Sequence, residues 1–160
     1  MNISKFTQKS VQAVQDLEKI AYEYGNQEIE EEHLLYALLT QEDSLILKLI
    51  EKMEIQKEYF IDTVKRALDA RVKVSGGELR FGQYLNKALV SAEDEAKAMG
   101  DEYVSVEHLF LSMLKNPSPS MKKLFNEFGI TRERFLQALS TVRGLSLIHI
   151  SEPTRRSYIS

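Results

Sequence analysis

The stretches "EIEEEHLLYALL" (Glu28–Leu39) and "YVSVEHLFLSML" (Tyr103–Leu114) both place Glu-His-Leu ahead of an apolar run. In each, the histidine follows a glycine by the same interval, counted from Gly25 in the first and from Gly100 in the second. Self-similarity at a fixed spacing is the sequence signature of a repeated structural unit. The two phrases therefore predict that the chain contains two copies of one fold.

The similarity continues on both sides of this phrase. Roughly 65 pairs of positions align without a gap, so the repeated unit is much longer than the phrase itself. Identical pairs include Phe6 and Phe81, Ala13 and Ala88, Ala21 and Ala96, Leu49 and Leu124, and Phe60 and Phe135. We interpret the pattern as an internal duplication, with repeat one at residues 3–70, a link at 71–80 and repeat two at 81–144.

Each copy has the apolar spacing of four helices. In repeat one, apolar residues recur at three- and four-residue steps, which is the period of a helix that buries one face. These segments cover residues 6–24, 34–39, 45–53 and 60–68. The sequence therefore predicts an all-α fold of eight helices, built as two tandem four-helix repeats that pack about a pseudo-two-fold axis.

Helix ends are marked by residues with known end preferences. Gly25, Gly100 and Gly129 stand where helices are predicted to end, in the left-handed conformation that glycine adopts easily. Ser105, Ser118 followed by proline, and Thr131 stand where helices are predicted to begin.

The composition excludes several classes of function. The chain has 160 residues, a formal net charge of −3, three histidines and no cysteine. Without cysteine there is no disulfide or thiolate chemistry, and three histidines leave little material for a zinc site. Lysines and arginines are scattered among acidic residues, which argues against a nucleic-acid partner. No apolar run reaches the ~20 residues that span a bilayer, and no signal peptide is apparent, so we expect a cytoplasmic protein without a membrane partner.

No motif in the sequence predicts catalysis. There is no phosphate-binding G-x-x-x-x-G-K-[ST], no H-E-x-x-H zinc motif and no nucleophile elbow, so we expect no enzymatic activity, metal or cofactor in this chain. We interpret the acidic run before His33 as a solvent-exposed helix start, where the helix dipole favours negative charge. We interpret both repeated histidines as structural residues that form local hydrogen bonds, with His108 reaching back toward Ser105.

The C-terminal segment "LSLIHISEPTRRSYIS" (Leu145–Ser160) has no counterpart in repeat one and no helical period. Residues 145–155 resemble the in-frame translation of a sequencing-library adapter. We therefore expect residues 145–160 to be a non-native tail and the natural chain to have continued past Gly144 in another way.

Residues 1–144 resemble the Clp N-terminal repeat (Clp R) domain of AAA+ disaggregase chaperones. The motifs that carry the resemblance are "KFTQKSVQAV", "EHLLYALL", "VSGG" and "AKAMGDEYVSVEHLFL". The resemblance implies a non-catalytic domain that engages unfolded or aggregated polypeptide for a motor working with the DnaK chaperone system. It also implies a monomeric fragment of a larger homohexamer, with ATP and magnesium bound only in motor domains outside this chain.

The resemblance further implies a binding site at Thr7, Asp101 and Glu107, which match the family's polar contact residues beside a shallow apolar groove. Each also has a local interpretation: Thr7 as a helix cap, Asp101 as a partner of turn amides, and Glu107 as a charge favoured by a helix dipole. Ser91, Glu95 and His108 stand at groove positions where some relatives carry leucine, so the chain departs from the family's groove there.

Two other functions are compatible with the same features. The chain could be the adaptor-binding N-terminal domain of a related unfoldase that feeds a protease. It could also be a free-standing helical module for protein interactions, without a motor. The sequence that naturally follows Gly144 would distinguish the three. Two nucleotide-binding P-loops would identify a motor protein, and a coiled-coil middle domain without a protease-docking loop would favour the disaggregase over the protease partner.

Overall fold

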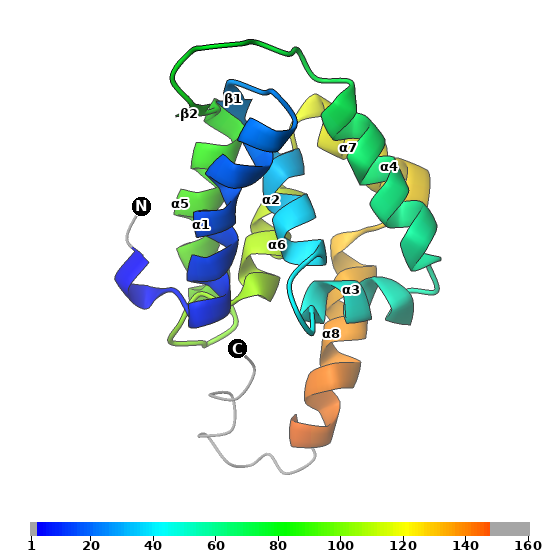
Figure 1. Cartoon of the computed structure of the whole chain (residues 1–160). Coiled ribbons are helices and arrows are strands. Elements are labelled where there is room, and N and C mark those ends of the chain that lie inside the picture. Colours follow the sequence, from blue (N-terminus) through cyan, green and yellow to red (C-terminus); the bar gives the residue numbers. More distant parts are fainter. Residues whose placement is uncertain (1–2, 148–160) are drawn as a thin grey trace.

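The structure is a computed structural model that describes residues 3–147, with side chains described as far as Gly144. Within that range the chain forms eight α-helices and three short elements (Figure 1). The helices are α1 (Gln8–Glu23), α2 (Glu31–Leu39), α3 (Leu45–Lys52), α4 (Lys57–Asp69), α5 (Gln83–Ala98), α6 (Val106–Lys115), α7 (Pro119–Phe128) and α8 (Arg132–Leu147). The short elements are a 3-10 turn at Ile3–Lys5 and the two-residue strands β1 (Glu28–Ile29) and β2 (Arg80–Phe81).

The element order confirms the predicted all-α fold of two four-helix repeats. The starts of α1 and α5, at Gln8 and Gln83, are as far apart in sequence as His33 and His108. The same separation holds for the starts of α2 and α6 and for those of α4 and α8. In Figure 1, α2 and α6 lie in the middle of the molecule, with α1 and α5 on one side and the remaining helices on the other.

Short extended segments connect the two repeats in a symmetric way. Strands β1 and β2 pair in parallel, with Ile29 opposite Phe81. An isolated parallel bridge joins Phe6 to Val104, which are the residues equivalent to Phe81 and Ile29 in the other repeat. In each case, the segment before a repeat's first helix pairs with the loop before the second helix of the other repeat. This exchange, together with the short link between the repeats, joins them into one domain.

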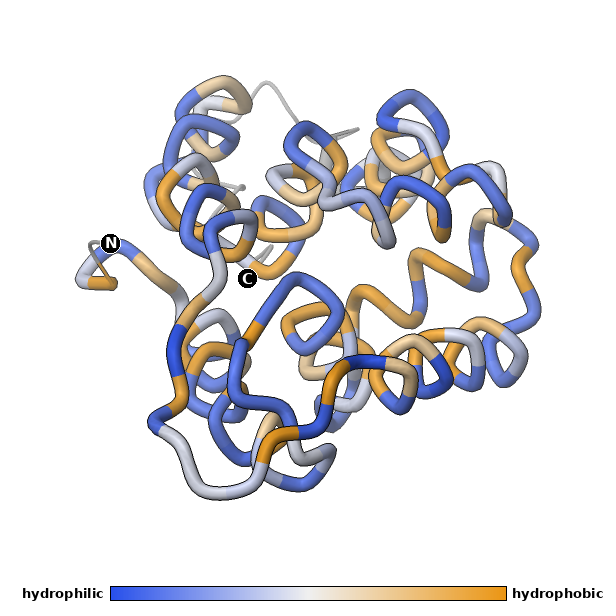
Figure 2. The backbone as a smooth tube through the Cα atoms, turned by 90° about the horizontal axis from the view of Figure 1, so that it is seen from above, coloured by the Kyte–Doolittle hydropathy of each residue, from blue (hydrophilic) through white to orange (hydrophobic). Residues whose placement is uncertain are grey.

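A single hydrophobic core runs through both repeats. Hydrophobic and hydrophilic positions alternate along each helix in Figure 2, as expected for helices that bury one face. The ring of Phe60 in α4 lies 4.9 Å from that of Phe128 in α7, and the Phe110 and Phe135 rings stack at 4.4 Å. Burial of each such side chain contributes about 1.5–3 kcal/mol, so the shared core stabilises the arrangement of the repeats as well as each repeat.

The predicted helix ends are present in the structure. Gly25, Gly100 and Gly129 adopt left-handed φ angles of 69°, 71° and 64°. Ser118 caps α7 by accepting a hydrogen bond from the backbone N–H of Met121, with proline next in the chain. Among residues 3–147, none of the helices combines the length and apolarity needed to cross a bilayer.

The last helix extends beyond the predicted end of repeat two. The backbone of α8 is helical to Leu147, three residues past Gly144, although the sequence there has no helical period. A boundary shift of this size is common at helix ends. Residues 148–160, most of the predicted non-native tail, lie outside the described residues, so that prediction stays untested.

Candidate functional site

The repeated histidines close capping boxes at the starts of α2 and α6. The Nδ1 atom of His33 accepts a hydrogen bond from the backbone N–H of Glu30 at 2.9 Å, and its Nε2 lies 2.9 Å from Asn26 Oδ1. Because Nδ1 accepts, Nε2 carries the proton and donates to the asparagine. Burial, helped by the nearby Arg71, lowers the pKa of His33 to about 4, so the ring is neutral at pH 7.

His108 repeats this geometry with one change of partner. Its Nδ1 accepts from the backbone N–H of Ser105 at 2.8 Å, as the sequence predicted. Its Nε2 lies 2.8 Å from Asp101 Oδ2, where repeat one has an asparagine. Both histidine side chains are fully buried. The structural interpretation of the Glu-His-Leu phrase is therefore confirmed.

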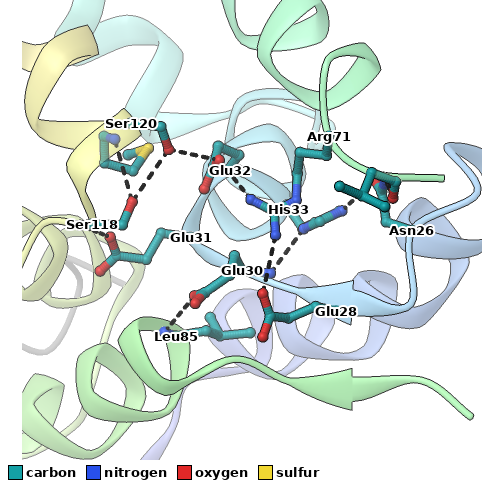
Figure 3. A network of polar contacts seen from close by, with 12 residues as sticks. Asn26, Glu28, Glu30, Glu31, Glu32, His33, Arg71, Leu85, Ser118 and Ser120 are labelled. Atoms are coloured by element: carbon teal, nitrogen blue, oxygen red, sulfur yellow. Dashed lines mark hydrogen bonds and ion pairs between the residues drawn. The ribbon is translucent and has the colours of Figure 1, made fainter. Parts of the chain in front are cut away.

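The interpretation of the acidic run as a solvent-exposed helix start is wrong. Glu30, Glu31 and Glu32 are all buried, and Figure 3 shows the polar contacts around them. Glu30 Oε1 accepts a hydrogen bond from the backbone N–H of Leu85 at 2.8 Å, in the first turn of α5. A Cβ at Gly82 would lie 2.2 Å from Glu30 Oε2, so the close approach of this carboxylate requires glycine there.

The other two carboxylates hold the start of α7. Glu31 Oε1 accepts from the backbone N–H of Ser118 at 2.8 Å, and Glu32 Oε2 accepts from the hydroxyl of Ser120 at 2.8 Å. Arg71 donates to Glu32 Oε2 at 3.0 Å. Free N–H groups and positive potential at helix starts attract carboxylates. The acidic run thus joins repeat one to two helices of repeat two.

Glu31 differs from Glu32, which pairs with Arg71, because no cation pairs with Glu31 among the described residues. Burial raises the pKa of its carboxyl to about 8, and the nearby Glu30 and Glu32 charges add to the rise, while the hydrogen bond from Ser118 opposes it. The group is therefore mostly protonated at neutral pH.

Thr7 is the N-cap of α1, as its local interpretation predicted. Its Oγ1 accepts a hydrogen bond from the backbone N–H of Ser10 at 3.2 Å. Thr7 also contacts repeat two, because its own N–H donates to the carbonyl oxygen of Val104 at 3.0 Å. The Ser10 hydroxyl donates to the same oxygen at 2.8 Å. Thr7 is therefore tied to the loop that begins at Asp101.

Asp101 and Glu107 are brought together by a residue that the sequence did not point to. Nη2 of Arg143, in α8, lies 2.8 Å from Asp101 Oδ2 and 3.0 Å from Glu107 Oε2. Burial alone would raise the pKa of Asp101, but the hydrogen bonds from His108 and Arg143 hold it below the usual range. Burial raises the pKa of Glu107 despite its charged neighbours. The sequence interpretations, with Asp101 as a partner of turn amides and Glu107 as a charge favoured by a helix dipole, therefore leave out Arg143 as their shared partner.

The three predicted groove positions do not form an open apolar surface. Ser91 is half-buried, and the buried Glu95 side chain pairs with Arg132 at 2.6 Å. His108 lies fully inside the protein. Glu95 and His108 therefore have partners within the protein, which explains how polar side chains can replace leucine there without leaving an unpaired charge in the core.

The surface clefts among the described residues include three of about 350–410 Å³. One lies between the end of α3 and α8, one beside the link, and one between α1 and the loop after α2. All have mixed polar and apolar walls. Within residues 3–147, no cluster of three or more histidine, aspartate or glutamate side chains is arranged to hold a metal ion.

Comparison with known proteins confirms the resemblance seen in the sequence. The Clp repeat (R) N-terminal domain family matches residues 5–142. The chaperone protein ClpB of Nitratidesulfovibrio vulgaris is 39% identical over 159 residues, which cover 96% of this chain and 18% of that protein. The chain thus spans about a fifth of the length of the curated relatives it matches.

Solved structures share the fold at lower identity. The Hsp104 N-terminal domain from Candida albicans matches with a TM-score of 0.75 and 22% identity, over 88% of this chain and 92% of that one. A ClpV N-domain in complex with a VipB peptide matches with a TM-score of 0.65 and 22% identity, over 86% of each chain. The duplicated helices, the exchanged strand pairs and the family match together show that this chain belongs to the Clp repeat (R) N-terminal domain family.

Proposed function

We propose that this chain is the polypeptide-engaging N-terminal domain of a ClpB-type disaggregase. In this role it binds segments of unfolded or aggregated protein for a hexameric ATP-driven motor, in the cytoplasm and together with the DnaK chaperone system. The observation that carries the proposal is the ClpB match across 96% of the chain. ATP and magnesium belong to the motor domains, and the domain itself acts by binding alone.

We propose Thr7, Asp101 and Glu107 as the residues on which this binding depends. Thr7 holds Val104 from the side of repeat one. Asp101 and Glu107 share the guanidinium of Arg143 on the other side of the same loop. Residues that are far apart in sequence thus converge on one short segment, as a shared role in binding requires.

Each site should bind weakly, and several sites should act together. A shallow site on a rigid helical domain is expected to give dissociation constants from micromolar to millimolar, or about −8 to −4 kcal/mol. Six such domains on one ring raise the effective concentration of sites without tighter contacts. Weak single contacts also allow the bound segment to be released to the motor.

The test uses the intact 160-residue chain and a fluorescently labelled, permanently unfolded protein. We expect measurable binding by fluorescence anisotropy, and a clear loss in T7A, D101A and E107A compared with E58A, a change of an exposed carboxylate in α4. The proposal is contradicted if all three variants bind like the parent chain at an unchanged melting temperature. Pure chain should hydrolyse no ATP, and detectable hydrolysis would refute the binding-only role.

The ClpV N-domain solved with a VipB peptide favours a second candidate, in which the domain binds a defined segment of a folded partner or adaptor. The two functions differ in sequence tolerance. Unrelated unfolded proteins should compete with one another for a disaggregase domain. An adaptor-binding domain would bind one partner tightly and ignore unfolded competitors.

A further inference from the structure

Asp101 and Glu107 are poorly placed to contact a bound polypeptide directly. Glu107 has an exposed fraction of 0%, and the side chain of Asp101 is 8% exposed. Arg143 closes over both carboxylates from α8. A client could touch Glu107 only after α6 and α8 separate, which would break this buried ion pair. Their effect on binding must therefore pass through a part of the protein that they hold in place.

The part that they hold is the turn from Asp101 to Ser105. Asp101 Oδ2 receives hydrogen bonds from His108 Nε2 and Arg143 Nη2, both at 2.8 Å. The other ring nitrogen of His108 accepts from the backbone N–H of Ser105 at 2.8 Å. One continuous chain of hydrogen bonds thus fixes both ends of the turn to α6 and α8.

The middle of the turn is fixed from repeat one. The backbone N–H of Val104 donates to the carbonyl oxygen of Lys5 at 2.8 Å, and the carbonyl oxygen of Val104 accepts from Thr7 at 3.0 Å. All three residues assigned to binding therefore act on the same five-residue turn. Asp101 anchors the start of the turn, Glu107 contacts the Arg143 guanidinium that bonds to Asp101, and Thr7 holds the centre.

The turn presents Tyr103 to solvent. Val104 is buried, whereas the neighbouring Tyr103 has an exposed fraction of 48%. The equivalent residue of repeat one is Glu28, whose carboxylate lies 3.4 Å from Arg71 and 4.0 Å from Arg80. The two repeats thus differ at this position, and only repeat two offers an aromatic side chain there.

We propose, on the basis of the proposed function, that Tyr103 contacts the bound polypeptide and that Asp101, Glu107 and Arg143 are positioning residues for its turn. The occupant is an extended, unfolded segment that carries apolar or aromatic side chains. A tyrosine suits such a ligand because its ring packs against varied apolar groups while its hydroxyl bonds to peptide groups, and it loses little conformational entropy on binding. Tyrosine is also enriched among residues that dominate binding energy.

The first test compares two exposed tyrosines by anisotropy with the labelled unfolded protein. Y103S should weaken binding by about fivefold, as loss of a single aromatic contact in a weak site. Y22S, which removes a tyrosine with an exposed fraction of 80% from α1, should bind like the parent. Neither change threatens the core. Binding by Y103S that equals that of the parent would overturn the inference.

The second test separates positioning from contact. R143L leaves the buried carboxylates of Asp101 and Glu107 without their cation, and E107L removes one of the two carboxylates that Arg143 contacts. The double variant E107L/R143L removes the Glu107–Arg143 pair, and replacement of a buried ion pair by apolar residues is often neutral. Each single variant should weaken binding by about fivefold and speed hydrogen exchange of the Val104 amide by about tenfold. The double variant should restore both to within about twofold of the parent, since Asp101 keeps its bond from His108.

The outcomes also distinguish a failure of this inference from a failure of the proposed polypeptide-binding function. A parent chain that binds no unfolded protein overturns both. A double variant with a protected Val104 amide and binding as weak as E107L shows that Glu107 touches the client, which overturns the positioning role. If the single variants do not fold, the comparison of Y103S with Y22S decides alone.

Discussion

Replacement of Glu31 by glutamine should change how the stability of this domain depends on pH. Glu31 has an exposed fraction of 0%, and its carboxyl pKa is raised from 4.5 to about 8. Between these values the unfolded chain carries an ionised Glu31 and the folded chain a protonated one. Folding then takes up one proton, so the free energy of unfolding falls by about 1.4 kcal/mol for each pH unit in this window.

His33 acts in the opposite direction over part of the same range. Its pKa is lowered from 6.5 to about 4, so the unfolded chain binds the extra proton and stability rises with pH between these values. In the parent chain the two contributions nearly cancel between pH 4.5 and 6.5. Above pH 6.5 only Glu31 of these two residues still adds a pH dependence, and its contribution to stability falls until about pH 8.

In E31Q the side-chain carbonyl still accepts from Ser118, but the group no longer titrates. Relative to the parent, E31Q should therefore gain about 4 kcal/mol between pH 5 and pH 8, the product of three pH units and the slope above. Other buried carboxyls, such as Glu30, are present in both proteins, so most of their contribution cancels in the difference.

The measurement is urea unfolding of parent and E31Q at half-unit steps from pH 5 to 8.5, followed by far-ultraviolet circular dichroism. E58Q serves as the control, because Glu58 is an exposed carboxylate in the first turn of α4. The reasoning is refuted if the E31Q and parent stabilities run parallel across this range, since Glu31 would then titrate alike in folded and unfolded chains.

Two further changes test other contacts. G82A should destabilise the domain by about 2–4 kcal/mol in urea unfolding, because its Cβ would displace the carboxylate of Glu30. G144A, with no atom within 4 Å of its added Cβ, should be neutral or slightly stabilising, because alanine favours a helix more than glycine does. An equal effect of both would contradict the packing described. D101N should be less stable than the parent at pH 7, and the gap should narrow as pH falls below the usual aspartate pKa of 3.8, because the lowered pKa of Asp101 contributes stability only while the group is ionised. A gap that stays constant down to pH 2.5 would show that charge is not its cause.

The fold was largely predictable because its signals are local or repeated. Apolar residues three and four apart predicted the helices, and a helix forms from contacts within one turn. The glycine and serine ends were predictable for the same reason, because caps are made by neighbouring residues. The repeated Glu-His-Leu phrase also predicted a structural role for both histidines, since each capping box spans only four residues.

The failures concern contacts between residues far apart in sequence. The acidic run looked like a solvent-exposed helix start because a run of glutamates reads the same in sequence whether it is exposed or buried. Its actual partners, Leu85, Ser118 and Ser120, lie more than fifty residues further along the chain. Arg143 was missed likewise, because nothing near it in sequence shows that α8 brings it to Asp101 and Glu107.

The sequence by itself determined that two homologous four-helix units exist, where most of their helices begin and end, and which family they belong to. Those properties follow from periodicity, caps and repeated motifs, which are written in neighbouring residues. Only the tertiary structure decided which charges are buried and what they hold: Glu30, Glu31 and Glu32 against repeat two, and Asp101 and Glu107 against Arg143. The physical reason is that burial and pairing of a charge depend on which distant segments pack against it, and that packing arises when the two repeats exchange strands and share one core.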